Sequence, residues 1–230
     1  DNNLPGSELS IGADTAINNA TWALDRIKES AAATKRCFVA EIMGRRCGYL
    51  TLMASLSSGA EYIYLNEDDV TLNEIADDTK RMVDSFAEGR RLFLVLVNEA
   101  VSKYYDREFL ASVYEAESDG KYDVRHAALG HLQQGGSPSP FDRLLATRLA
   151  HRALDHINNQ FNRGESEGVY IGQVRNQIEA RLVKNMFEDL DIRNRRPFDQ
   201  WWRELSPVQR IVSMKDSGKP AVEISIADPE

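Results

Sequence analysis

Residues 92–97, LFLVLV, form the most hydrophobic run of the sequence, and the polar pair Asn98-Glu99 follows directly. Six consecutive apolar residues are typical of a strand that is buried on both faces, as in the middle of a parallel sheet. This stretch therefore predicts a central parallel strand whose carboxyl end is marked by Asn98 and Glu99.

Further strands are expected on either side of this one in the sequence. Apolar runs occur at Cys37–Ile42, Tyr62–Leu65 and Ala127–Leu129, with two later ones at Val169–Val174 and Ala180–Val183. Between them, apolar residues recur at helical spacing. The expected helices cover residues 17–27, 48–57, 72–86, 108–117 and 141–161, and Thr71 with Glu74 is placed like a capping box. Alternating strands and helices predict an α/β protein with a parallel layered (Rossmann-like) sheet flanked by helices.

Composition excludes several classes of function. The 28 basic and 36 acidic residues give a net charge of −8, which argues against a nucleic-acid partner. No apolar stretch reaches the roughly 20 residues needed to cross a bilayer, and no charged-then-apolar leader opens the chain, so we expect no membrane partner. Only two cysteines, Cys37 and Cys47, indicate a reducing, cytoplasmic setting. His151 and His156 lack cysteine partners at zinc spacing, so no metal site is expected.

Polar groups follow three of the predicted strands, where α/β sheets bind their ligands. They are Met43-Gly44-Arg45, Glu99 and His131. Gly44 lets backbone N–H groups approach an anion, and Arg45 can fork onto phosphate oxygens. A surface turn with a solvated arginine is the competing interpretation.

The loop of residues 130–138, GHLQQGGSP, is a second candidate. His131, Gln133 and Gln134 supply uncharged donors and acceptors that suit sugar hydroxyls. The alternative is a polar strand-to-helix connection, with Pro140 near the helix start. Glu99 is either a ligand acceptor or the partner of an arginine.

For three other residues, the position in the sequence allows both a functional and a purely structural role. Arg36 and Arg125 each lie just before a predicted strand. Their position in the sequence favours solvated charges over ligand-binding residues. Asp1 is either a general base or a frayed first residue. Neither a GxxxxGK[ST] loop nor a GxGxxG motif is present, so no nucleotide cradle is visible.

Taken together, the motifs resemble the ATP-dependent 6-phosphofructokinase family, in kind and order, from Asp1 to about Arg210. The matching segments are DNNLPGSELSIGADTA (1–16), VAEIMGRRCGYLTLMASL (39–56), Glu99, LGHLQQGGSPSPFDRLLATRLA (129–150) and RNRRPFDQWW (193–202). The resemblance implies a phosphofructokinase-like fold. It also implies a sugar-phosphate-binding domain over residues 1–210 that lacks the upstream nucleotide loops, followed by a tail at 211–230. The whole enzyme would use ATP and Mg²⁺ to phosphorylate fructose 6-phosphate in glycolysis, and this fragment alone would be inactive.

Several positions bear on which half of such an enzyme this chain is. Catalytic copies carry D-N-D where this chain has Asp1-Asn2-Asn3, and an arginine where it has Gln134. Both departures, and the Trp201-Trp202 pair, favour the C-terminal regulatory half, which binds the allosteric activator fructose 2,6-bisphosphate. Asp1 and Arg45 favour the alternative, a catalytic half that binds fructose 6-phosphate with Asp1 as general base.

The resemblance also implies roles for individual residues. Asp1, Asn2 and Asn3 would face sugar hydroxyls, and Glu99 would accept from the ring. Phosphate oxygens would be held by Arg36, Arg125 and Arg195. The rest of the pocket would comprise Met43, Gly44, Arg45, His131, Leu132, Gln133 and Gln134.

Geometry adds an expectation about oligomerisation. Arg36 and Arg45 lie at opposite ends of one strand, up to roughly 30 Å apart. They cannot both contact one phosphate in the same pocket. We therefore expect Arg36 and Arg125 to reach into the pocket of a second copy in a homo-oligomer such as a homotetramer. The N-terminal catalytic half is the other expected partner.

Overall fold

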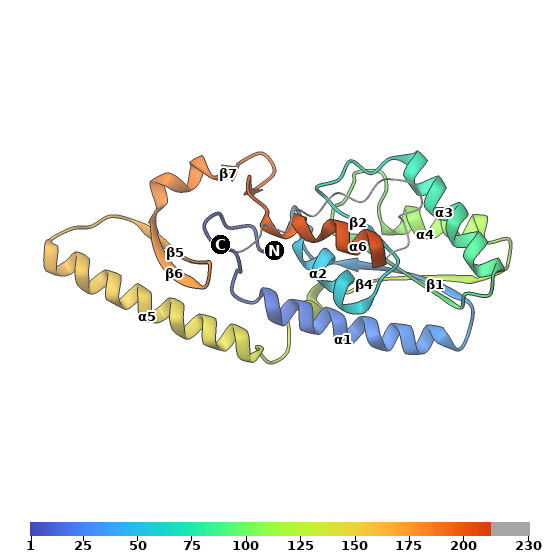
Figure 1. Cartoon of the computed structure of the whole chain (residues 1–230), viewed down its shortest axis with the longest axis horizontal. Coiled ribbons are helices and arrows are strands. Elements are labelled where there is room, and N and C mark those ends of the chain that lie inside the picture. Colours follow the sequence, from blue (N-terminus) through green and yellow to red (C-terminus); the bar gives the residue numbers. More distant parts are fainter. Residues whose placement is uncertain (213–230) are drawn as a thin grey trace, which may run out of the picture.

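A four-stranded parallel sheet forms the centre of the computed structural model, which describes residues 1–212 (Figure 1). The strands lie in the order β2-β3-β1-β4, and their bounds are β1 Arg36–Ile42, β2 Tyr62–Tyr64, β3 Leu92–Asn98 and β4 Asp123–Ala128. The first four helices are α1 Ala13–Ala32, α2 Tyr49–Ser58, α3 Leu72–Ala87 and α4 Arg107–Glu117. This arrangement confirms the predicted α/β fold with a parallel sheet flanked by helices.

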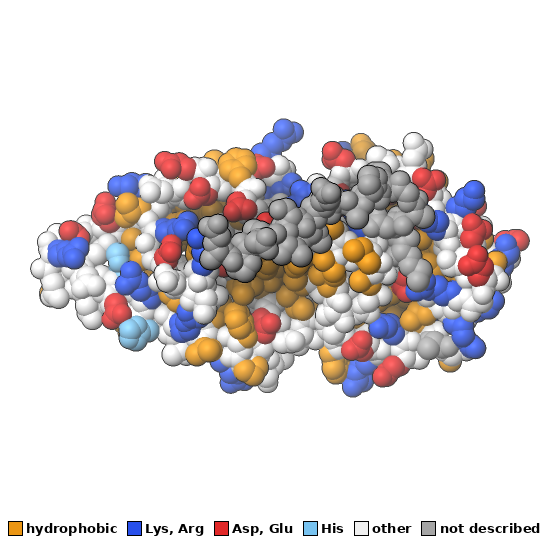
Figure 2. Space-filling model, viewed as in Figure 1, with side chains coloured by type: hydrophobic (Ala, Val, Ile, Leu, Met, Phe, Trp, Pro, Cys, Tyr) orange, Lys and Arg blue, Asp and Glu red, His pale blue; other side chains and the backbone are white. Residues whose placement is uncertain are grey.

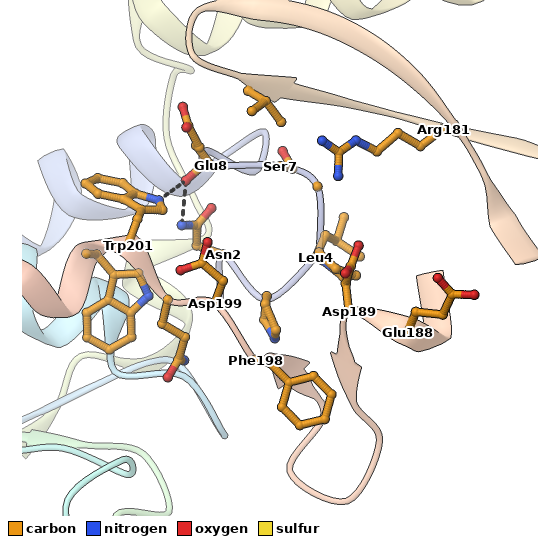
Figure 3. Close-up of a pocket in the computed structure, with 16 residues that line it drawn as sticks. Asn2, Leu4, Ser7, Glu8, Arg181, Glu188, Asp189, Phe198, Asp199 and Trp201 are labelled. Atoms are coloured by element: carbon orange, nitrogen blue, oxygen red, sulfur yellow. Dashed lines mark hydrogen bonds between the residues drawn. The ribbon is translucent and has the colours of Figure 1, made fainter. Parts of the chain in front are cut away.

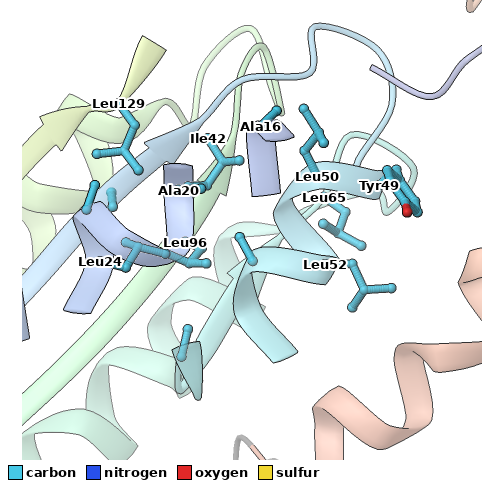
Figure 4. Close-up of a cluster of buried hydrophobic side chains, with 14 of the residues drawn as sticks. Ala16, Ala20, Leu24, Ile42, Tyr49, Leu50, Leu52, Leu65, Leu96 and Leu129 are labelled. Carbon is cyan, nitrogen blue, oxygen red and sulfur yellow. The ribbon is translucent and has the colours of Figure 1, made fainter. Parts of the chain in front are cut away.

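The two faces of the sheet carry separate hydrophobic cores, because side chains alternate along each strand. From β3, Leu94 and Leu96 pack against α1 and α2, including Leu24 of α1 (Figure 4). Phe93 and Val95 of the same strand point the other way, into the cluster formed with α3 and α4. The prediction of a central strand buried on both faces is therefore confirmed.

A second lobe lies beside the sheet in Figure 1. It contains the long helix α5 (Pro140–Arg163) and the antiparallel hairpin of β5 (Val169–Val174) and β6 (Gln177–Leu182). The helix begins at Ser139, whose hydroxyl accepts from the N–H of Asp142. A second, very short hairpin then returns the chain to the sheet lobe. The remaining elements are β7 Leu190–Asp191, β8 Arg196–Pro197, α6 Ser206–Val212 and the 3₁₀ turns Gly130–Gln133, Val183–Glu188 and Trp201–Leu205.

The strand predicted at Ala127–Leu129 needs correction. In the structure β4 spans Asp123–Ala128, so Arg125 lies within the strand rather than before it, and Arg36 is the first residue of β1. The β4 strand is at the edge of the sheet, and three of its four exposed residues, Asp123, Arg125 and His126, are polar, which is a common way to protect an edge. The expected capping box is confirmed, since the Thr71 side chain accepts from the N–H of Glu74.

The surface mixes charges of both signs on the face that Figure 2 shows, with hydrophobic side chains gathered near its middle. Among residues 1–212, none of the helices combines the length and apolarity that a membrane span requires. The predicted tail, residues 211–230, lies outside the described part of the chain from residue 213 onward; residues 211 and 212 belong to α6.

Candidate ligand site at the strand ends

A pocket of about 440 Å³ opens at the carboxyl ends of β1, β3 and β4. The residues around it come from four separate segments of sequence, which the parallel strands bring to one edge of the sheet. Its lining residues are Asp1, Glu41, Met43, Arg45, Glu99, Gly130, His131 and Gln134. Six of these eight were predicted as site residues.

The turn between β1 and α2 has a conformation that requires glycine at residue 44. Gly44 has φ 138°, and a Cβ there would lie 2.5 Å from the carbonyl oxygen of Cys47. The Asn98 side chain donates to the Gly44 carbonyl at 2.7 Å, which fixes the turn to the end of β3. The backbone of this turn is therefore held rigidly against the sheet.

Arg45 is the cation of the pocket. Its Nε lies 3.5 Å from Oε1 of Glu99, and its side chain is 73% exposed. The other carboxylate oxygen of Glu99 accepts from the Gly44 N–H at 3.4 Å. Glu99 thus orients Arg45 while leaving most of the guanidinium free to meet an anion.

The segment after β4 supplies the opposite wall. His131 Nδ1 and Gln134 Oε1 are 2.9 Å apart, so these two side chains are held together at the pocket edge. Gln133 is buried, and its Oε1 accepts from the Met43 N–H at 2.7 Å. Gln133 therefore supports the turn that carries Arg45. Leu132 is 65% exposed and is not among the lining residues.

The first three residues have different environments. Asp1 lines the pocket. Asn2 is buried and turned into its own loop: its Nδ2 donates to the carbonyl of Glu8, which also accepts from Trp201 Nε1 (Figure 3). The Asn3 amide donates to the Arg195 carbonyl at 3.3 Å. Asn2 therefore shapes the loop, while Asn3 connects it to the C-terminal part of the described chain.

The loop that Asn2 shapes also borders a second, smaller pocket of about 280 Å³, drawn in Figure 3. Phe198 and Trp201 lie on one side of it and Arg181 of β6 on the other. A third cavity, of about 530 Å³, adjoins the strand-end pocket and shares Asp1, Met43 and Gln134 with it. The site at the strand ends thus has room for a ligand larger than a single phosphate.

Arg36 and Arg125 do not join this pocket. Arg36 is the first residue of β1, whereas Arg45 follows its carboxyl end. Both Arg36 and Arg125 approach the same carboxylate oxygen of Asp123, at 3.7 Å and 3.9 Å. The structure therefore groups these two arginines at the amino-terminal edge of the sheet, away from Arg45.

Glu41 is a lining residue that the sequence analysis did not select. It ends an apolar run on β1, and its carboxylate lies 3.9 Å from Nη1 of Arg107, the first residue of α4. Partial burial raises the pKa of Glu41, which Arg107 opposes. A charged residue near the carboxyl end of a buried strand was the signal that could have revealed it.

Within the part of the chain that the structure describes, no group of three histidine, cysteine, aspartate or glutamate side chains is arranged to hold a metal ion. The sequence also lacks both glycine-rich phosphate loops. The groups that converge on the pocket suit a phosphorylated, hydroxyl-rich ligand.

Comparison with known proteins agrees with this chemistry. The phosphofructokinase family model matches residues 1–157. The chain is 39% identical over 216 residues to an ATP-dependent 6-phosphofructokinase of Dictyostelium discoideum. This alignment covers 93% of this chain and 26% of that protein. It is 36% identical over 223 residues to the human muscle-type enzyme, covering 92% of this chain and 29% of that protein.

A solved phosphofructokinase structure from Saccharomyces cerevisiae superimposes with a TM-score of 0.87 at 33% identity, covering 93% of this chain and 30% of that one. The chain belongs to the phosphofructokinase family. It spans between a quarter and a third of the length of these relatives.

Proposed function

We propose that this chain is part of an ATP-dependent 6-phosphofructokinase and that its strand-end pocket binds a phosphorylated hexose. The observation that carries the proposal is the convergence of Arg45, Glu99 and His131 on one pocket. Arg45 supplies the charge for a phosphate, and Glu99 and His131 supply an acceptor and a polar ring for hydroxyls and oxygens. ATP and Mg²⁺ would bind to other parts of the whole enzyme.

The ligand that fits best is fructose 2,6-bisphosphate, acting as an allosteric activator on a C-terminal regulatory half. Asn3 and Gln134 support this choice, because each is uncharged where the catalytic pattern has a charged residue. Asn3 also uses its amide to hold the Arg195 carbonyl. A site of this kind binds and orients its ligand without transferring a phosphoryl group.

A catalytic half that binds fructose 6-phosphate is the second candidate. Asp1 supports it, because this residue lines the same pocket as Arg45 and Glu99. In that role Asp1 would accept the proton of the attacking sugar hydroxyl.

Self-association belongs to the same proposal. Arg36 and Arg125 lie on or next to the exposed edge strand β4, at the end of the sheet opposite their own pocket. In a homo-oligomer they would add positive charge to the pocket of a second copy.

Isothermal titration calorimetry with the two sugar phosphates tests the choice of ligand. We expect fructose 2,6-bisphosphate to bind about tenfold or more tightly than fructose 6-phosphate, because its second phosphate adds charge-assisted hydrogen bonds. Tighter binding of fructose 6-phosphate would favour the catalytic half. An absence of heat with both sugars, in a folded protein, would contradict a sugar-phosphate site.

A second test restores a missing charge. Gln134→Arg is expected to tighten fructose 6-phosphate binding about tenfold, because a guanidinium can donate two parallel hydrogen bonds to a phosphate. Gln134→Lys is the matched control, with the same charge but no fork, and we expect a smaller gain. Equal affinities of wild type and Gln134→Arg in calorimetry would show that this position does not face the phosphate.

A further inference from the structure

The hairpin tip, which we define as residues 192–195 between β7 and β8, carries Arg195 next to the N-terminal loop. Arg195 has φ 55°, a left-handed conformation that non-glycine residues seldom adopt. Each of the two flanking strands has only two residues. A ribbon this short is not stable by itself, so the position of the tip depends on ties to its surroundings.

Two side chains from outside the hairpin hold backbone carbonyls of the tip. Arg46 Nη1 donates to the carbonyl of Arg193 at 2.8 Å, and Asn3 Nδ2 donates to that of Arg195 at 3.3 Å. Arg46 is exposed and comes from the β1–α2 turn, immediately after Arg45. One rigid turn therefore directs one arginine to the pocket and the next to the hairpin tip.

We propose that Arg46 is a positioning residue for ligand binding, which acts by fixing the hairpin tip that carries Arg195 beside the N-terminal loop. The inference rests on the proposed function and on the phosphate-binding role that the family resemblance implies for Arg195. Its physical basis is preorganisation: a tip that is already tied down loses less conformational freedom when its arginine engages the ligand. The glycine conformation at residue 44 makes the turn a firm anchor for this tie.

The test is a double-mutant cycle read by calorimetry with fructose 2,6-bisphosphate. We expect Arg46→Ala to weaken binding about threefold to fivefold, the scale of an exposed charge-assisted contact. Arg46→Lys can still donate to the carbonyl and is expected to retain most of the affinity. Arg193→Ala is the matched control, because it keeps the backbone carbonyl that Arg46 uses, and it should bind nearly as wild type does.

The cycle separates positioning from direct contact. If Arg46 acts through Arg195, then Arg46→Ala causes no further loss in an Arg195→Ala background. Fully additive losses would mean that Arg46 contacts the ligand itself and would overturn the proposal, as would an Arg46→Ala affinity equal to that of wild type.

Hydrogen exchange of the backbone amides of residues 190–196 gives a readout that needs no ligand. We expect Arg46→Ala to speed exchange there, while Arg193→Ala does not. Suppose that Arg46→Ala exchanges faster than wild type, but the wild-type protein binds neither sugar. That result would support the contact between Arg46 and the hairpin tip and would contradict the proposed function. Unchanged exchange would overturn the tie itself.

Discussion

Replacing Glu67 by alanine is expected to lower the free energy of unfolding by about 3 kcal/mol, the scale of breaking a buried ion pair. The Glu67 side chain is fully buried, and its Oε1 lies 3.3 Å from Arg196 Nη1. The same oxygen accepts from Gln200 Nε2 at 3.0 Å. Both carboxylate oxygens are also 3.0 Å from the Gly48 N–H, at the start of α2. The variant removes the carboxylate partner of the mostly buried guanidinium of Arg196, which keeps a contact with Asn66 Oδ1 at 3.4 Å, and it takes the acceptor from the Gly48 N–H.

Chemical denaturation followed by circular dichroism measures this loss. Asp68→Ala is the neighbouring control, because Asp68 forms a solvent-exposed ion pair with Arg203 at 2.9 Å. That control should lose less than about 1 kcal/mol. Similar losses of unfolding free energy for the two variants would show that the buried contacts of Glu67 stabilise the fold no more than an exposed ion pair does.

Replacing Arg45 by alanine is expected to weaken sugar-phosphate binding about tenfold to a hundredfold. A hydrogen bond from a charged donor contributes about 1.5–3 kcal/mol, and Arg45 is the cation that lines the described strand-end pocket. Its removal also leaves the carboxylate of Glu99 facing an anionic ligand. Calorimetry with fructose 2,6-bisphosphate and with fructose 6-phosphate measures the effect, and either sugar should report it.

Arg26→Ala is the control for the change in net charge. Arg26 lies on the exposed side of α1, over the ring of Trp22, and takes no part in the pocket. We expect this variant to bind with nearly wild-type affinity at physiological ionic strength, because distant surface charges are screened. Equal losses in the two variants would assign the effect to overall charge, against a direct contact from Arg45.

The interior of the sheet could be predicted from sequence because burial on both faces leaves a plain signal. Leu92–Val97 and Cys37–Ile42 are runs of mainly apolar residues, and both became inner strands. The edge strand β4 gave a weaker signal, since Asp123, Arg125 and His126 face solvent. Only its last apolar residues were recognised, which shifted its predicted start by four residues.

For the candidate site, the sequence indicated which residues lie near the strand ends, but it gave little information about their hydrogen-bond partners. The rule that ligands bind beyond strand ends selected Arg45, Glu99 and His131, and these three residues line one pocket in the structure. It could not show that Gln133 turns inward to hold the Met43 N–H, nor that Arg46 reaches a hairpin almost 150 residues later in the chain. Such contacts depend on the tertiary path of the chain, which local patterns do not encode.

The link between Glu67 and Arg196 has a consequence for synthesis of the polypeptide on the ribosome. Domains generally fold as units during synthesis, once the residues that complete them have been made. Glu67 emerges long before the arginine that neutralises it, and α2 must wait for Arg196 and Gln200 before its surroundings are complete. The buried surroundings of Glu67 can therefore be completed only after residues 196–200 have been translated, which makes this part of the sheet lobe late to assemble.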